Sequence, residues 1–111
     1  MRYNLMIVPG TVFFCRIPFW GQTAEAFAYV IEQKRGLVRI RITPMKNDTV
    51  HHTVWVTIGE IDLAQRLDIL REVTRTECLS CDGLMRLTTA TRGTKSMTVF
   101  ACRECTEIIE L

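Results

Sequence analysis

Four cysteines in the last third of the chain limit what it can fold into more than any other feature. Cys78, Cys81, Cys102 and Cys105 follow the spacing C-x₂-C-x₂₀-C-x₂-C. Two cysteines separated by two residues in a tight turn direct both thiolates at one ion, and a second such turn completes a tetrahedron of sulfurs. The spacing therefore predicts one closed metal site. Because four protein thiolates leave no position for water, we expect its role to be structural and not catalytic.

The residues between the two cysteine pairs must leave one turn and return to the other. A β-hairpin makes that return economically, so we expect arms at residues 84–89 and 97–100, a tip at 91–96 and an added strand over 107–111. The tip carries Arg92 and Lys95 and no carboxylate. These cations suit phosphates or an acidic protein surface, although a solvated hairpin tip has the same composition.

The segment from residue 77 to 111 resembles the zinc-ribbon family of transcription factors, polymerase subunits, ribosomal proteins and primases. The resemblance implies Zn²⁺ as the metal. A rubredoxin-like iron site, which uses the same four thiolates, and a dithiol redox centre are the alternatives. Ribbon turns often carry a glycine just after the second cysteine. This chain departs from that pattern, with Asp82 before Gly83 in the first turn and Thr106 in the second.

Short β-strands precede the cysteine pairs. We expect them at residues 11–17, 26–31, 37–43 and 50–58, because each segment is rich in Val, Ile or aromatic residues and ends at turn residues. The third alternates, with Val38, Ile40 and Ile42 on one face and arginines on the other. Cys15, in the first strand, is predicted to be an inert core thiol. Asp62 with Gln65 forms a capping-box pattern that predicts a helix over 63–73.

These strands, with a long first loop and a tight hairpin, resemble the Src-homology-3-like and KOW-type small barrels over residues 9–63. The fold class expected is therefore mainly β: a small β-barrel-like unit with one short α-helix over residues 1–75, then a zinc ribbon over 76–111. Proteins with such barrels bind peptides, nucleic acid, or ribosomal and polymerase surfaces, so the resemblance leaves function open.

Positive charge is concentrated before the cysteine pairs. Residues 1–75 contain ten Lys/Arg and seven Asp/Glu, a formal charge of +3, and residues 76–111 contain four and five, a formal charge of −1. A basic strand face beside exposed aromatics would suit single-stranded nucleic acid, and the alternative is a solvated face with the aromatics in the core. The candidate contact residues are Lys34, Arg35, Arg39, Arg41, Arg92, Lys95, Phe19 and Trp20.

Nothing in the sequence matches a catalytic motif such as GxSxG, a P-loop or HExxH. We therefore expect a non-enzymatic zinc-binding protein that contacts nucleic acid or a nucleoprotein machine of transcription or translation. The alternative is a small protein–protein interaction module, such as an adaptor or a phage-type inhibitor of a host enzyme. We expect no small-molecule substrate and no membrane association. No apolar run approaches a membrane span or a signal-peptide core, which favours the cytoplasm.

Overall fold

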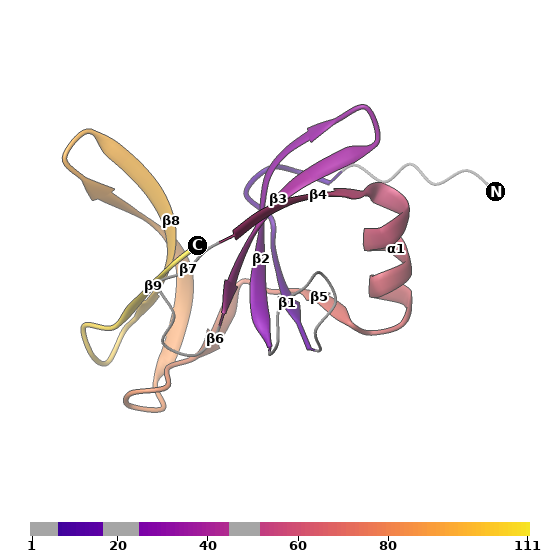
Figure 1. Ribbon diagram of the computed structural model, residues 1–111. Coiled ribbons are helices and arrows are strands. Elements are labelled where there is room, and N and C mark those ends of the chain that lie inside the picture. Colours follow the sequence, from indigo (N-terminus) through magenta and orange to yellow (C-terminus); the bar gives the residue numbers. More distant parts are fainter. Residues whose placement is uncertain (1–6, 17–24, 45–51) are drawn as a thin grey trace. The chain divides into compact units, whose positions relative to one another are not determined.

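The computed structural model describes residues 7–16, 25–44 and 52–111 (Figure 1). The chain divides into two compact units, Met1–Glu72 and Val73–Leu111. The described residues are mainly β with one helix, and the cysteine cluster lies in the second unit. The expected fold class is confirmed. Within these residues, no helix is long and apolar enough to cross a membrane.

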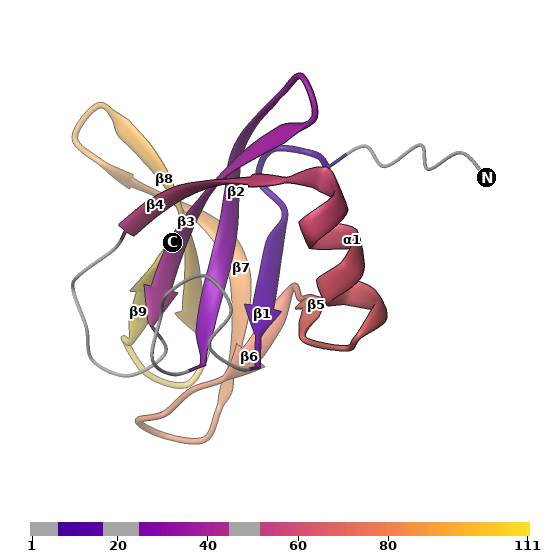
Figure 2. The same cartoon turned by 45° about the vertical axis from the view of Figure 1, so that its right-hand side comes forward.

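The first unit is one antiparallel sheet that curls into a half-barrel (Figure 2). Strand β1 pairs on one side with β2 and on the other with β5, so the strand order is β4-β3-β2-β1-β5. The strands span Val12–Cys15 (β1), Ala26–Lys34 (β2), Leu37–Pro44 (β3), His52–Thr57 (β4) and Leu70–Glu72 (β5).

Alternation in β3 sets the inner face of this sheet, as expected. Val38, Ile40 and Ile42 are buried in the core. Cys15 contributes to the same core and is fully buried, which confirms that it is a core thiol. Each buried aliphatic side chain contributes about 1.5–3 kcal/mol relative to an exposed one, so this cluster stabilises the sheet without any help from a metal.

The helix prediction was wrong in position. Helix α1 spans Ile58–Arg66 and its N-cap is Thr57, whose side chain accepts from the Glu60 N–H while Glu60 accepts from the Thr57 N–H. A second capping-box pattern five residues earlier than Asp62 thus begins the helix. Leu70, expected on the helix, instead lies in β5, where it pairs with Cys15 of β1. Asp68, at φ 58°, reverses the chain between α1 and β5.

The turn between β2 and β3 places a cation at a strained position. Arg35 and Gly36 have φ values of 52° and 80°, the pattern of a type I′ turn. Asparagine or glycine is usual at the first of these positions, because a left-handed conformation costs other residues about 1–2 kcal/mol. The Ile58 N–H donates to the Gly36 carbonyl at 3.0 Å and so fixes this turn beside the start of α1.

The second unit is a four-stranded antiparallel sheet in the order β6-β7-β8-β9. Its centre is a long hairpin whose two-residue turn begins at Gly93, with φ 64°. The predicted arms and the added strand are confirmed, although the arms extend further toward the tip than expected. Strand β6 was not predicted. The strands span Arg75–Glu77 (β6), Leu84–Arg92 (β7), Lys95–Cys102 (β8) and Ile108–Glu110 (β9).

Candidate metal centre

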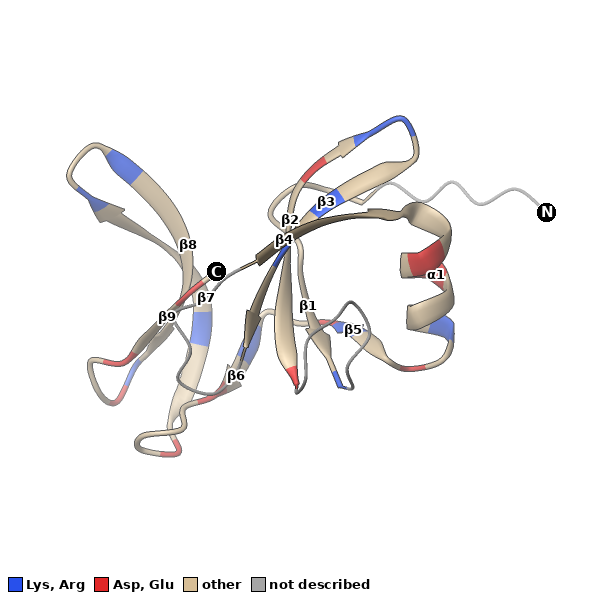
Figure 3. Cartoon of the chain, viewed as in Figure 1, with Lys and Arg blue, Asp and Glu red and all other residues tan. Residues whose placement is uncertain are grey.

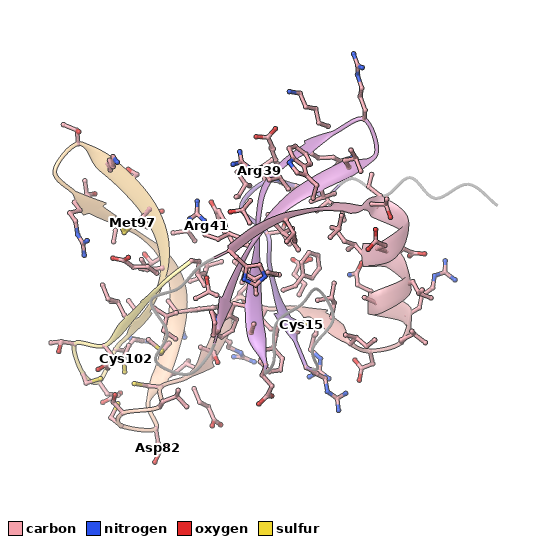
Figure 4. The ribbon with its side chains drawn as sticks, viewed as in Figure 1. Cys15, Arg39, Arg41, Asp82, Met97 and Cys102 are labelled. Atoms are coloured by element: carbon pink, nitrogen blue, oxygen red, sulfur yellow. The ribbon has the colours of Figure 1, made fainter. Side chains whose placement is uncertain are left out.

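Four thiols meet at the end of the second unit away from the hairpin turn (Figure 4). The Sγ atoms of Cys78 and Cys105 lie 3.7 Å apart, those of Cys81 and Cys102 lie 3.4 Å apart, and all four lie within 4.8 Å of one another. A tetrahedron with metal–sulfur bonds of about 2.3 Å has edges of about 3.8 Å, whereas a disulfide bond measures about 2.05 Å. The four thiols have the spacing of a metal site and could hold one ion.

The first cysteine turn is closed by its own backbone. The Cys78 N–H donates to the Gly83 carbonyl at 2.8 Å, and the Asp82 N–H donates to the Cys78 carbonyl at 3.0 Å. Asp82 lies in the left-handed region with φ 60°. This explains why glycine suits the position after the second cysteine, and why aspartate, which tolerates that region better than most residues, can stand there.

Gly83 is required for a different reason, the close approach of the second turn. A Cβ atom at this position would lie 2.6 Å from Glu104 Cγ, 3.0 Å from Glu104 Cβ and 3.1 Å from Cys81 Sγ. Because contacts below 3.0 Å force neighbouring atoms to move, a larger residue here would push the two cysteine turns apart. The missing side chain of Gly83 therefore helps to bring the four sulfurs together.

The second cysteine turn continues directly from β8. The Cys102 N–H donates to the Glu107 carbonyl at 3.0 Å, and the Arg103 N–H donates to the Leu84 carbonyl at 3.3 Å. The pairing of Met85 with Cys102 then fixes this turn at the open end of the hairpin. Thr106 does not take a left-handed conformation, so the second turn has no position that calls for glycine.

Backbone donors also point at two of the sulfurs. The Gly83 N–H donates to Cys81 Sγ at 3.4 Å, and the Glu104 N–H donates to Cys102 Sγ at 3.4 Å. Such hydrogen bonds favour the thiolate form of a cysteine. Each cysteine turn therefore supplies at least one N–H group that stabilises negative charge on a sulfur.

The four thiols do not ionise alike. Loss of solvent raises the pKa of Cys102, but the N–H groups of Glu104 and Cys105 and the neighbouring thiols outweigh it and lower that pKa to about 7. At Cys81 the Gly83 N–H lowers the pKa, yet hydrogen bonds with the other thiols prevail and raise it to about 12. The pKa of Cys105 is also raised, with the Glu107 N–H opposing the shift. A metal ion would displace the protons that these thiols retain.

The cluster is open to solvent on one side. Cys78 is buried, Cys81 is exposed and the other two cysteines are half-buried. Leu79, inside the first turn, is 62% exposed. An ion held here is therefore accessible to a chelator without prior unfolding of the unit.

The predicted contact residues occupy two separate hairpins. Lys34 and Arg35 lie at the β2–β3 turn, and Arg39 and Arg41 follow along β3 on the side of the sheet away from Cys15 (Figures 3 and 4). Arg92 and Lys95 close the β7–β8 turn in the other unit. Phe19 and Trp20 lie outside the described residues.

Two of these arginines already have acidic neighbours. Arg92, at a hairpin tip that has no carboxylate of its own, pairs with Glu110 of β9 at 3.0 Å. Arg39 lies 3.7 Å from Glu32, which the β2–β3 register places opposite it. Arg41 lies over the Tyr29 ring at 5.9 Å.

Sequence reasoning missed one residue beside these cations. Trp55 pairs directly with Arg39 across β3 and β4 and is 48% exposed. Its alternation with Val54 and Val56 is the signal in the sequence that places it on the outer face of β4. Its position next to Arg39 depends on the β3–β4 register, however, and no motif in the sequence specifies that register.

No family model, curated protein or solved structure matches the chain.

Proposed function

We propose that this chain is a non-enzymatic zinc-binding protein that contacts nucleic acid or a nucleoprotein machine of transcription or translation. The observation that carries the proposal is the set of four thiols whose sulfurs all lie within 4.8 Å of one another. Thiolate sets of this kind accept Zn²⁺ or iron, and zinc is the usual occupant of a site formed by two Cys-x-x-Cys turns. Four sulfurs complete its coordination, so the ion would stabilise the second unit and take no part in chemistry.

The basic β2–β3 hairpin supports contact with nucleic acid. Lys34 and Arg35 are exposed, and among the described residues no ion pair involves either of them. Lysine and arginine side chains bind phosphate oxygens, and this attraction supplies most of the sequence-independent affinity for nucleic acid.

Two measurements test the proposal. Metal analysis of the purified protein should find one zinc per chain, and a coloured iron centre or a metal-free folded protein would contradict the zinc assignment. Anisotropy titrations with labelled oligonucleotides should show affinity that falls steeply as salt rises. Absence of binding at about 50 mM salt, where phosphate contacts are strong, would remove the nucleic-acid part of the proposal.

A second candidate function is that of a protein-interaction module. Leu63 of helix α1 and its C-cap residue Leu67 are exposed, at 52% and 60%, one turn apart. Neighbouring apolar side chains on an exposed helix face are typical of surfaces that receive a protein partner. A pull-down with and without nuclease distinguishes the two functions, because a protein partner bound at α1 stays after nuclease treatment and is lost in a Leu63→Ser, Leu67→Ser variant.

A further inference from the structure

A tryptophan on the edge strand β4 lies beside the arginines of β3 on one face of the sheet in the first unit. Residues paired directly across antiparallel strands point to the same side of the sheet, with their Cβ atoms about 4.5–5.5 Å apart. Trp55 is paired in this way with Arg39, and Arg41 and Leu37 are its diagonal neighbours on β3. The other β4 residues on this face are Thr53 and Thr57, both small. The indole ring is therefore flanked along its own strand only by short side chains.

Exposure distinguishes Trp55 from the other large aromatic side chains of this sheet. Phe13 and Phe27 are buried, at 2% and 1%, and Phe27 packs against Phe14 with ring centroids 5.9 Å apart. Trp55 remains 48% exposed. An indole ring buries a large apolar area when a partner covers it, so leaving half of it in water sacrifices stability that a ligand can recover.

The charges around Trp55 are mostly positive. Arg39, Arg41, Lys34 and Arg35 lie on β3 or at the β2–β3 turn, and Glu32 is the acidic residue that the register brings among them. Arg39 and Arg41 are two residues apart on one strand, which separates their Cα atoms by about 6.7 Å. Two guanidinium groups at such a spacing can contact successive phosphates of an extended strand.

The turn that carries Arg35 is held in place. Its left-handed conformation, φ 52°, favours asparagine or glycine, and the Ile58 N–H fixes the adjacent Gly36 carbonyl beside the end of β4. A residue that contradicts the local preference of an otherwise regular turn is a common feature of functional sites. Arg35 is thus a cation at a position where the turn itself is better served by another residue.

From these observations we propose that the outer face of β3 and β4, together with the β2–β3 turn, binds single-stranded nucleic acid, with a base stacked on Trp55 and phosphates on Arg35, Arg39 and Arg41. This inference rests on the proposed nucleic-acid contact and specifies its substrate class. A single strand can offer the face of a base to an indole ring, whereas a duplex hides its base faces in the stack. Cationic side chains alone bind both single strands and duplexes. We therefore expect the preference for single strands to come from Trp55.

The first experiment compares single strand with duplex. Zinc-loaded full-length protein is titrated into a fluorescein-labelled twelve-nucleotide strand of mixed sequence and into its duplex, in DNA and in RNA, at about 50 mM salt. We expect the single strands to bind at least about tenfold more tightly. Equal or stronger binding of the duplexes would overturn the inference while leaving the proposed function intact. Absence of binding to every oligonucleotide would remove both.

The second experiment removes the indole ring. A base stacked on an aromatic residue contributes enough that Trp55→Ala should weaken single-strand binding about fivefold or more, with little change for the duplex. Trp55→Phe, which keeps a ring, should retain most of the affinity. Leu67→Ala, which removes a similarly exposed apolar side chain at the C-cap of α1, is the matched control and should bind like wild type. Wild-type affinity in Trp55→Ala would overturn the inference.

Fluorescence supplies a test that needs no truncation of Trp55. The chain has two tryptophans, so a Trp20→Phe variant leaves Trp55 as the only indole. Its emission should be quenched by the unlabelled strand, with the same midpoint as an anisotropy titration of that same variant. Unchanged emission at saturating strand would show that no base stacks on Trp55.

The third experiment separates charge from folding at Arg35. Arg35→Asn supplies the residue that a type I′ turn prefers, so the melting temperature should rise or stay unchanged. Binding to the single strand should nevertheless weaken, and the slope of log K against log salt should fall by about 0.7 for the lost phosphate contact. Arg66→Gln removes the same charge from α1 and should leave the slope unaltered. An unchanged slope in Arg35→Asn would exclude Arg35 from the site.

Discussion

In the first cysteine turn, Asp82 is a non-glycine residue in a left-handed backbone conformation. Its φ of 60° favours glycine, and aspartate is tolerated there at a cost. We expect zinc-loaded Asp82→Gly to be at least as stable as wild type and Asp82→Ala to be less stable than Asp82→Gly by about 1 kcal/mol, because only alanine adds a Cβ clash. Both variants remove the same charge, so thermal melts of the pair isolate the backbone effect.

The thiols predict how zinc affinity depends on pH. Protons compete with the metal for sulfur, so affinity falls as pH falls. Cys81, with its pKa raised to about 12, and Cys105, whose pKa is also raised, are both protonated near neutrality. Each must lose a proton when zinc binds, so these two residues alone should weaken the apparent affinity by about 100-fold for each pH unit lost between pH 8 and 6.

Competition titrations with a chromophoric chelator of known pH dependence measure this slope. Cys102 should add to the slope mainly below pH 7, because its pKa is lowered to about 7 and above that pH it is largely thiolate. A slope shallower than tenfold per pH unit would mean that the thiols enter the site already ionised, contrary to the hydrogen bonds among them.

At the scale of elements, the start of α1 depends on Thr57. Its side chain and that of Glu60 satisfy each other's backbone N–H groups, so Thr57→Ala should destabilise the first unit by about 1 kcal/mol. Asp62→Ala is the informative control, because the sequence had suggested Asp62 as the cap. In the structure Asp62 pairs with Arg66 at 2.8 Å, and such surface pairs contribute less than about 1 kcal/mol.

Denaturant unfolding of the two variants ranks the two capping patterns. A larger loss of stability in Asp62→Ala than in Thr57→Ala would place the helix start at the later position. The two candidates arise because two capping-box patterns, Thr57 with Glu60 and Asp62 with Gln65, lie five residues apart.

Sequence periodicity could not choose between these two starts. The leucines Leu63 and Leu67 have helical spacing, but so do Ile61 and Ala64, and only the second pair is buried. The choice is made by packing against the sheet, to which Leu70 contributes from β5. Three-residue strands such as β5 and β6 are too short to show an alternation, so their existence depends on partners distant in sequence.

The longer strands and the cysteine cluster were predictable because their signals are local. Alternation over β3 needs no knowledge of its neighbours, and each Cys-x-x-Cys turn specifies two ligands by itself. By contrast, the residue that lies opposite a given strand residue is determined by pairing with a strand distant in sequence. The placing of Glu32 and Trp55 beside Arg39 follows from two strand registers, one of them shifted by an irregularity between Val30 and Glu32, and the sequence does not specify these registers.

At the scale of the whole molecule, the reactivity of the five cysteines measures the folding of each unit separately. Cys15 is buried in the sheet of the first unit, and the other four form the cluster in the second. In the zinc-loaded protein we expect no rapid reaction with a thiol reagent. After chelation four cysteines should react and Cys15 should not, because the core around Cys15 contains no metal ligand.

Mass spectrometry of the labelled protein counts the modified cysteines and identifies them by peptide. Modification of Cys15 together with the other four would mean that loss of the metal unfolds the first unit as well. Cys81→Ser should reproduce the effect of chelation, because removal of one of four ligands leaves the site incomplete.

The position of the cysteine turns at the open end of the β7–β8 hairpin has a consequence for the order of folding. The hairpin pairs from Arg92 and Lys95 down to Met85 and Cys102, and its formation takes only about 1–10 μs. We therefore expect pairing of these strands to bring the two cysteine pairs together before the ion binds. Gly93→Val, which strains a turn with φ 64°, should therefore slow metal uptake in stopped-flow experiments more than it hastens release. We expect the residue that most affects how fast this site acquires its metal to lie at the end of the hairpin farthest from the sulfurs.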